Sequence, residues 1–237
     1  MTSLPLLSDY HIRFSLPSPL TFLFLSDLHE CRISPLLRWV REKHPDAVLV
    51  AGDVVQNENK YENGLLFLRK ASAQCPVFLS IGNHDLRLRD DGMQLLRETG
   101  AEVLDDRAAG FGGLLLGGLS SGFSQSQSTL DTTPEPDLGF LSHFAAMDGR
   151  KLLLCHHPEY YARYIRSLPI DLTLSGHAHG GQWRIFGRGI FAPGQGLFPK
   201  YTSGLYDGRL LVSRGLGNPC GIPRFFNPPE GILLTIE

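Results

Sequence analysis

The fold is decided by a stretch that reads TFLFLSDLH at residues 21–29, an apolar run that ends at Asp27 and His29. The same design recurs as AVLVAGD at residues 47–53 and as VFLSIGNHD at residues 77–85. A run that is apolar along its whole length predicts a strand covered on both faces, as in a parallel sheet. Because functional groups in such sheets lie beyond the carboxyl ends of the strands, each run predicts functional side chains at its end.

Helical patterns separate these runs and continue the alternation along the chain. The spacing predicts helices, the first of them capped by Ser34, over residues 34–43, 61–73, 90–99 and 138–147. Two more buried strands are predicted over residues 151–155 and 172–175. Shorter antiparallel strands are predicted over residues 184–186, 201–206, 210–213 and 232–236. The first half of the chain therefore predicts parallel βαβ units.

Composition places the chain among ordinary globular proteins. It has 237 residues, of which 42% are hydrophobic and 19% charged, and a net charge of −2 at pH 7. This length favours a single domain over residues 1–237, with a core from about residue 20 and an N-terminal extension over residues 1–19. Since the net charge is near zero, no stable nucleic acid partner is expected.

The expected location follows from the cysteines, the N-terminus and the apolar runs. The four cysteines form no CxxC pair, and residues 1–20 lack the basic start of a signal peptide, so a cytoplasmic location is expected. The apolar runs are too short to cross a membrane. Residues 186–198 carry several apolar side chains that either pack on the protein body or touch lipid. At most a peripheral membrane contact is expected.

Polar clusters follow five of the predicted strands: DLH at 27–29, GD at 52–53, GNHD at 82–85, HHP at 156–158 and GHAH at 176–179. They offer oxygen and imidazole donors without a thiolate, a mixture that suits manganese, iron or zinc. The candidate metal ligands are Asp27, His29, Asp53, Asn83, His156, His177 and His179. Seven donors are too many for one four-coordinate ion, so two divalent metal ions are expected. A single Asp or Asn at a strand end is usually a turn residue, but the combination argues against that interpretation.

The ordered motifs D-x-H, G-D, G-N-H-[DE], H and G-H-x-H resemble the calcineurin-like metallophosphoesterase family over residues 22–182. GHAHGGQ at 176–182, SRGLG at 213–217 and PRFFNPPE at 223–230 resemble a subgroup of bacterial enzymes. That subgroup includes phosphodiesterases and enzymes that cleave UDP-diacylglucosamine. With this resemblance we expect an α/β fold, a two-sheet β-sandwich flanked by helices in four αββα layers.

The resemblance also implies how the metal ligands are shared. One metal would be held by Asp27, His29 and His179. The other would be held by Asn83, His156 and His177, with Asp53 bridging both.

Five more residues receive roles in catalysis or substrate binding. His84 is implied to be the proton donor to the leaving oxygen, and Asp85 is implied to orient His84. Arg214 and Arg224 are candidates for substrate contact because Arg binds phosphate in a bidentate manner, although structural salt bridges would explain them equally well. His157 either supports the ligands from behind or contacts the substrate.

The expected reaction is hydrolysis of a phosphodiester, pyrophosphate or phosphomonoester by a metal-bridging hydroxide. The resemblance of the tail favours the first two bonds, and a nucleotide–lipid is one candidate substrate. Two alternatives are a nuclease with the same chemistry and a non-catalytic metal-binding scaffold of the same fold. A nuclease would need a basic, aromatic-lined groove. A scaffold would be expected to have lost ligands, whereas this chain keeps the full set.

Overall fold

The computed structural model describes residues 4–88, 91–124, 132–219 and 221–237. The first of its two main sheets has the strand order β1-β16-β2-β3-β4-β5. Its strands are β1 (Leu6–Ile12), β16 (Glu230–Ile236), β2 (Leu20–Leu25), β3 (Ala47–Ala51), β4 (Val77–Ser80) and β5 (Glu102–Leu104). From β2 to β5 the strands run parallel, so their carboxyl ends share one edge of the sheet.

The second main sheet has the order β14-β15-β9-β8-β7-β6. Its strands are β14 (Gly204–Tyr206), β15 (Leu210–Val212), β9 (Leu172–Ser175), β8 (Arg150–Cys155), β7 (Leu114–Leu119) and β6 (Arg107–Phe111). The four central strands are parallel, and both edge strands are antiparallel to their neighbours. Two small hairpins follow β9: β10 (Arg184–Ile185) with β11 (Arg188–Gly189), and β12 (Phe191–Ala192) with β13 (Gly196–Leu197).

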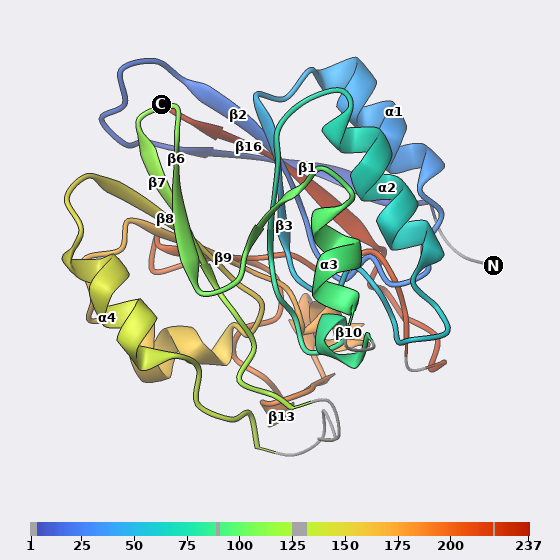
Figure 1. The fold of residues 1–237 in the computed structure, drawn as a ribbon. Coiled ribbons are helices and arrows are strands. Elements are labelled where there is room, and N and C mark those ends of the chain that lie inside the picture. Colours follow the sequence, from blue (N-terminus) through green and yellow to red (C-terminus); the bar gives the residue numbers. More distant parts are fainter. Residues whose placement is uncertain (1–3, 89–90, 125–131, 220) are drawn as a thin grey trace.

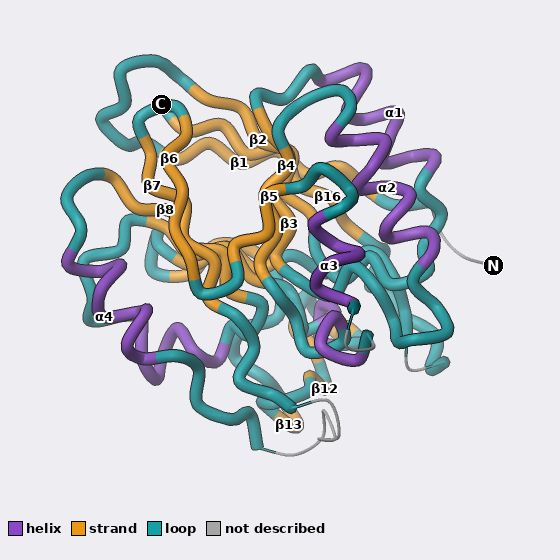
Figure 2. The backbone as a smooth tube through the Cα atoms, in the orientation of Figure 1, coloured by secondary structure: helices purple, strands orange, loops and turns teal. Residues whose placement is uncertain are grey.

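The sheets face each other and the helices cover their outer faces (Figures 1 and 2). The first sheet is covered by α1 (Ser34–Lys43), α2 (Glu62–Ser72) and α3 (Gly92–Arg97), and the second by α4 (Leu138–Ala146). A buried apolar cluster that includes Phe24, Leu49 and Leu152 fills the space between the sheets. Separate clusters lie under each helical layer. The predicted two-sheet α/β sandwich flanked by helices is thereby confirmed.

Most predicted elements are found within a few residues of their expected bounds, but three details differ. Ser34 does not cap α1: Ile33 holds the cap position with helical torsions, and Pro35 fits the first turn because no intrahelical N–H is needed there. Not all late strands are antiparallel, since β15 runs parallel to β9 and β16 runs parallel to β1. The segment expected as an N-terminal extension contains β1, which forms the edge of the first sheet.

Among the residues that the structure describes, no helix combines the length and the apolar character needed to span a membrane. The longest, α2, has 11 residues.

Candidate metal centre

The seven predicted ligands lie in loops that follow five strands of the two sheets. Asp27 and His29 follow β2, Asp53 follows β3 and Asn83 follows β4. On the other sheet, His156 follows β8, while His177 and His179 follow β9. All seven side chains are buried. Because β2, β3 and β4 are neighbours and β8 and β9 are neighbours, their carboxyl ends bring these loops together.

The backbone at the site is held in an unusual conformation. Five of the seven ligand candidates have left-handed φ values: Asp27 at 51°, His29 at 46°, Asp53 at 54°, His177 at 62° and His179 at 45°. A residue other than glycine in this region costs on the order of 1–3 kcal/mol and persists only where its surroundings hold it. This concentration of strained residues is typical of a functional site.

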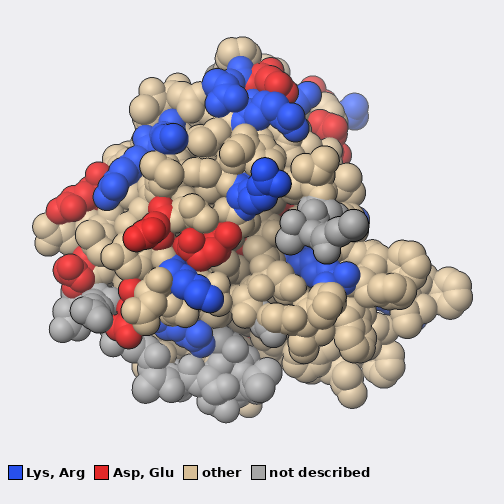
Figure 3. Space-filling view, turned by 90° about the vertical axis from the view of Figure 1, so that its right-hand side faces the viewer, with Lys and Arg blue, Asp and Glu red and all other residues tan. Residues whose placement is uncertain are grey.

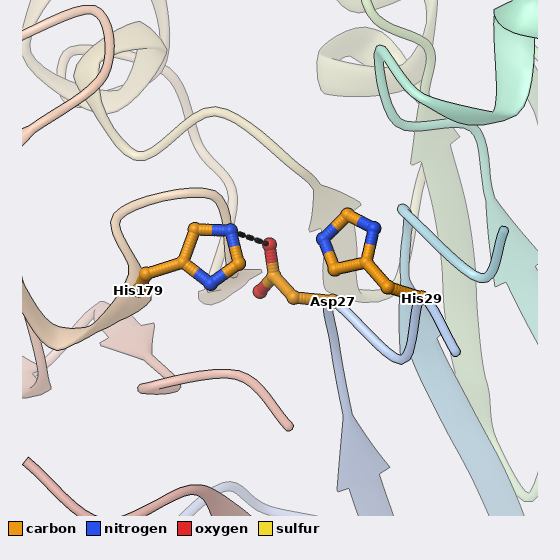
Figure 4. A group of neighbouring side chains, drawn as sticks. All are labelled: Asp27, His29 and His179. Carbon is orange, nitrogen blue, oxygen red and sulfur yellow. Dashed lines mark ion pairs between the residues drawn. The ribbon is translucent and has the colours of Figure 1, made fainter. Parts of the chain in front are cut away.

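One group of donors consists of Asp27, His29 and His179, whose ligand atoms lie within 4.8 Å of one another. Figure 4 shows the two imidazole rings on either side of the Asp27 carboxylate. His179 Nε2 is 3.5 Å from Asp27 Oδ1. His29 donates from Nδ1 to the Val55 carbonyl at 3.2 Å, which leaves the lone pair of its Nε2 directed into the group.

A second group consists of Asp53, His156 and His177, again within 4.8 Å. His156 donates from Nδ1 to the Ala51 carbonyl at 2.7 Å, and its Nε2 is 3.1 Å from Asp53 Oδ2. The same Asp53 oxygen is 3.8 Å from His29 Nε2. Asp53 therefore lies between the two groups, as a carboxylate shared by two ions would.

Unpaired buried atoms test whether these residues fit metal ions. Among the described residues, Nε2 of His29 and His177 and both side-chain polar atoms of Asn83 are buried without a hydrogen-bond partner. Each such atom costs about 1–3 kcal/mol when nothing satisfies it. Cations placed among them would satisfy the nitrogen lone pairs and the Asn83 oxygen, so the donor set fits divalent metals.

The electrostatics of the site favour the ligand forms of these side chains. Burial lowers the pKa of His29 to about 3 and holds the pKa values of His177 and His179 well below their usual range. Although burial opposes it, His156 and His84 keep the pKa of Asp53 well below its usual range. Neutral imidazoles beside a carboxylate are the forms in which these groups bind metal.

The pKa values of His156 and Asp27 indicate that the site favours positive charge. Burial alone would lower the pKa of His156, but the carboxylates of Asp53 and Asp27 raise it to about 10. Burial and the nearby Asp53 raise the pKa of Asp27, although His156 opposes this shift. Two buried carboxylates thus favour a proton on a neighbouring ring. A divalent cation would supply positive charge at the same place.

His84 sits at the edge of the groups and is only half-buried. Its backbone N–H donates to Asp53 Oδ1 at 2.8 Å, and its ring Nδ1 donates to the Gln56 carbonyl at 2.6 Å. The ring packs edge-on against His29 with centroids 4.8 Å apart. This leaves Nε2 as the ring nitrogen without a backbone acceptor.

Asp85 has a different environment from the one expected. Both of its oxygens accept from backbone N–H groups: Oδ2 from Asp53 and Gly82 at 2.8 and 2.9 Å, and Oδ1 from Val54 and Val55 at 2.9 and 3.2 Å. These contacts fix the loop that carries Asp53. That Asp85 orients the His84 ring stays a prediction.

The three candidates for substrate contact occupy different positions. His157 is fully buried, shares a 2.7 Å hydrogen bond with the Ser121 hydroxyl, and packs against the rings of His156 and His177. Arg214 is turned toward Glu230, with Nε 3.7 Å from its carboxylate.

Arg224 lies against a candidate ligand. It donates to His179 Nδ1 at 3.0 Å and to three backbone carbonyls, those of Arg214, Gly215 and Gly217. Of the two arginines, Arg224 is thus the one in contact with the candidate metal centre.

Sequence reasoning missed Glu159. Its carboxylate is buried, accepts from the Thr133 hydroxyl at 2.5 Å and lies 3.6 Å from His157 Nδ1. With His157 and His177 it forms another group of donor atoms within 4.8 Å. Its place directly after the HHP motif was the signal available in the sequence.

Several bacterial proteins are similar to this chain over most of its length. A metallophosphoesterase of Helicobacter pylori strain J99 is 28% identical over 228 residues, which cover 91% of this chain and 59% of that protein. Phosphodiesterase YaeI of Escherichia coli K12 is also 28% identical, with 92% and 83% covered. The UDP-2,3-diacylglucosamine pyrophosphatase LpxG of Chlamydia muridarum is 26% identical, with 87% and 80% covered. The chain thus spans less than two thirds of the Helicobacter relative.

One solved structure and one family pattern also match this chain. The crystal structure of phosphopantetheinyl hydrolase from Mycobacterium tuberculosis has a TM-score of 0.51 and 14% identity over 84% of this chain and 90% of that one, a likeness in fold. The pattern of the calcineurin-like phosphoesterase family matches residues 20–181, which hold all seven ligand candidates. Since this match covers more than half of its length, the chain belongs to the calcineurin-like phosphoesterase family.

Proposed function

We propose that the protein is a phosphohydrolase that works with two divalent metal ions. The observation that carries the proposal is the pair of neighbouring donor groups on either side of the Asp53 carboxylate. Buried polar atoms of His29, His177 and Asn83 add to it, since they have no hydrogen-bond partner among the described residues. Asp27, His29 and His179 would hold one ion, and Asn83, His156 and His177 the other. Manganese, iron and zinc all suit these oxygen and imidazole donors.

Bound metals would supply an activated water and neutralise charge on the phosphate. Residues of the chain protonate the leaving group and hold the ligand loops in place. Protonated His84 donates Nδ1–H to the Gln56 carbonyl and keeps Nε2–H for the leaving-group oxygen. As the phosphorus–oxygen bond breaks, that oxygen takes the electron pair and the proton. Asp85 keeps Asp53 and the Gln56 loop in place through its four backbone contacts.

We further propose a phosphodiester or pyrophosphate as the bond that is cleaved. One relative is named a phosphodiesterase and another a pyrophosphatase of a nucleotide-linked lipid. Both are distant, at 28% and 26% identity, and the proposal rests on these names. We propose that residues 1–237 act as one domain, because the loops of both sheets contribute to one site.

Metal content and hydrolysis test the proposal together. Protein purified without chelator should hold two metal ions per chain and should cleave bis-p-nitrophenyl phosphate faster than p-nitrophenyl phosphate with added Mn²⁺. Asp53→Asn should lose bound metal and activity, whereas His84→Ala should keep its metal and lose activity by about 10²–10⁴-fold. The exposed His143 on α4 gives the control His143→Ala, which should match the wild type.

Two outcomes would contradict the proposal. If no metal binds and no cleavage occurs with Mn²⁺, Fe²⁺ or Zn²⁺, the chain is not a metal-dependent hydrolase. If metal binds but neither ester is cleaved by the wild type, a non-catalytic metal-binding scaffold becomes the better interpretation.

A further inference from the structure

Exposed apolar side chains are concentrated in one part of the protein. Of the thirteen large apolar side chains that are exposed among the described residues, nine lie in segments 183–198 and 222–226. They are Trp183, Ile185, Phe186, Phe191, Leu197, Phe198, Ile222, Phe225 and Phe226. We call these nine side chains the aromatic surface. Phe186 is 101% exposed and Phe226 is 75% exposed, so neither ring is used to pack the core.

Backbone contacts join the two segments into one surface. Arg184 N–H donates to the Phe225 carbonyl at 3.0 Å, and Phe225 N–H donates to the Gln182 carbonyl at 3.3 Å. The Trp183 indole donates to the Pro223 carbonyl at 2.9 Å. The rings of Phe225 and Phe226 lie 4.3 Å apart. The aromatic surface is therefore built before any partner binds, and binding need not order it.

One end of this surface, at residues 224–227, adjoins the candidate metal centre. Asn227, which follows Phe226, donates to the His179 carbonyl at 2.7 Å. Arg224, which precedes Phe225, donates to the His179 ring. A partner bound at residues 225 and 226 would therefore lie close to His179, one of the candidate metal ligands.

The charge around the aromatic surface is positive. Residues 183–200, which supply six of the nine side chains, contain Arg184, Arg188 and Lys200 and no Asp or Glu, in a chain whose net charge is −2. Arg184 donates to the carbonyl of Gly180 at 2.8 Å, a contact that does not neutralise its charge. Figure 3 shows the uneven distribution on one face: charged side chains gather at the left and centre, and the part that projects at the right is largely uncharged.

We propose that the aromatic surface docks on the headgroup layer of a bilayer that contains anionic phospholipid. Rings of Trp and Phe partition into the interface of a bilayer, and surrounding Lys and Arg are attracted to anionic lipid. Monomeric proteins rarely expose a contiguous apolar area of this kind without a partner. A second copy of this chain fits poorly, because pairing would place two positively charged surfaces face to face.

Vesicle sedimentation tests this docking with the manganese-loaded protein. We expect binding to phosphatidylcholine vesicles that contain about 30% phosphatidylglycerol, weaker binding at high salt, and little binding to phosphatidylcholine alone. The double variant Phe186→Ser/Phe226→Ser and the variant Arg188→Glu should each lower the binding constant by about tenfold or more. All three positions are exposed, so the fold should persist, as circular dichroism would check.

Matched controls come from the opposite part of the chain. Leu66→Ser on α2 and Arg38→Glu on α1 change an exposed apolar and an exposed basic side chain outside the aromatic surface, and both should bind like the wild type. Wild-type protein that fails to sediment with anionic vesicles, or variants that bind as well as it does, would overturn the proposal. So would a wild-type dimer in light scattering that the double variant dissociates, since a second copy would then cover the surface. The assay measures binding alone, so its result is independent of hydrolysis.

Discussion

Gly64 connects the stability of α2 to the geometry of the metal centre, and Gly64→Ala tests this connection. Gly64 lies inside α2 against the loop that follows β3. A Cβ added there would lie 2.7 Å from Val54 Cγ1 and 3.0 Å from the Val54 carbonyl carbon, and closer still to the carbonyl oxygen. Val54 stands between Asp53 and Val55, whose carbonyl accepts from His29. A methyl group at this position must therefore displace the loop that carries a candidate ligand.

Two opposing effects set the magnitude. Replacing glycine by alanine inside a helix usually stabilises it by up to about 1 kcal/mol. Forcing a methyl into a packed site costs about 1–3 kcal/mol. The neighbour here is backbone held through Asp85, so it relaxes less easily than a side chain tip. We expect a net loss of about 1–2 kcal/mol in the free energy of unfolding, and a fall in Mn²⁺ affinity of about tenfold.

Urea unfolding in EDTA measures the stability without bound metal, and calorimetric Mn²⁺ titration measures the affinity. Gly139→Ala in α4 is the matched control, because a Cβ there would meet only the Asp137 carboxylate at 3.1 Å. It should leave the free energy of unfolding unchanged or raise it by up to about 1 kcal/mol. A Gly64→Ala protein as stable as the wild type, with the same Mn²⁺ affinity, would refute the reasoning.

Three further substitutions probe the side chains behind the ligands. Asp85→Asn would turn an NH₂ group toward the backbone N–H groups of Asp53 and Gly82. Mn²⁺ affinity should therefore fall about 10–100-fold in calorimetric titration. Unchanged affinity would contradict the role of Asp85 in holding Asp53. Glu159→Gln removes the buried charge shared with His157 and His177 and should lower Mn²⁺ affinity by about tenfold, while the exposed Asp148→Asn should have no effect. Arg224→Ala leaves three carbonyls without this donor and should cost about 1–3 kcal/mol in urea unfolding; a loss below that range would show that water replaces the guanidinium.

Local pattern was enough to predict most of the strands and helices and the polar residues of the centre, whereas the two-sheet sandwich was expected from the family resemblance. The runs at 22–25 and 47–51 are apolar and buried at every position, as a strand covered on both faces requires. Because polar groups gather at the carboxyl ends of parallel strands, the same runs located Asp27 and Asp53. The strand β1 was not predicted because it lies at a sheet edge, where its partly exposed residues follow no clear alternation of buried and exposed positions.

The sequence by itself determined the order of the strands along the chain and the chemical nature of the donors, because both depend on residue type and short spacing. Only the tertiary structure decided which atoms meet. Asp85 stands next to His84 in sequence, yet its carboxylate turns to amides about thirty residues away. Likewise, only folding brought Glu159 to His177 and joined the apolar residues at 183–198 to those at 222–226. Side-chain direction depends on backbone torsions and on neighbours brought by other strands, and neither is set by local sequence pattern.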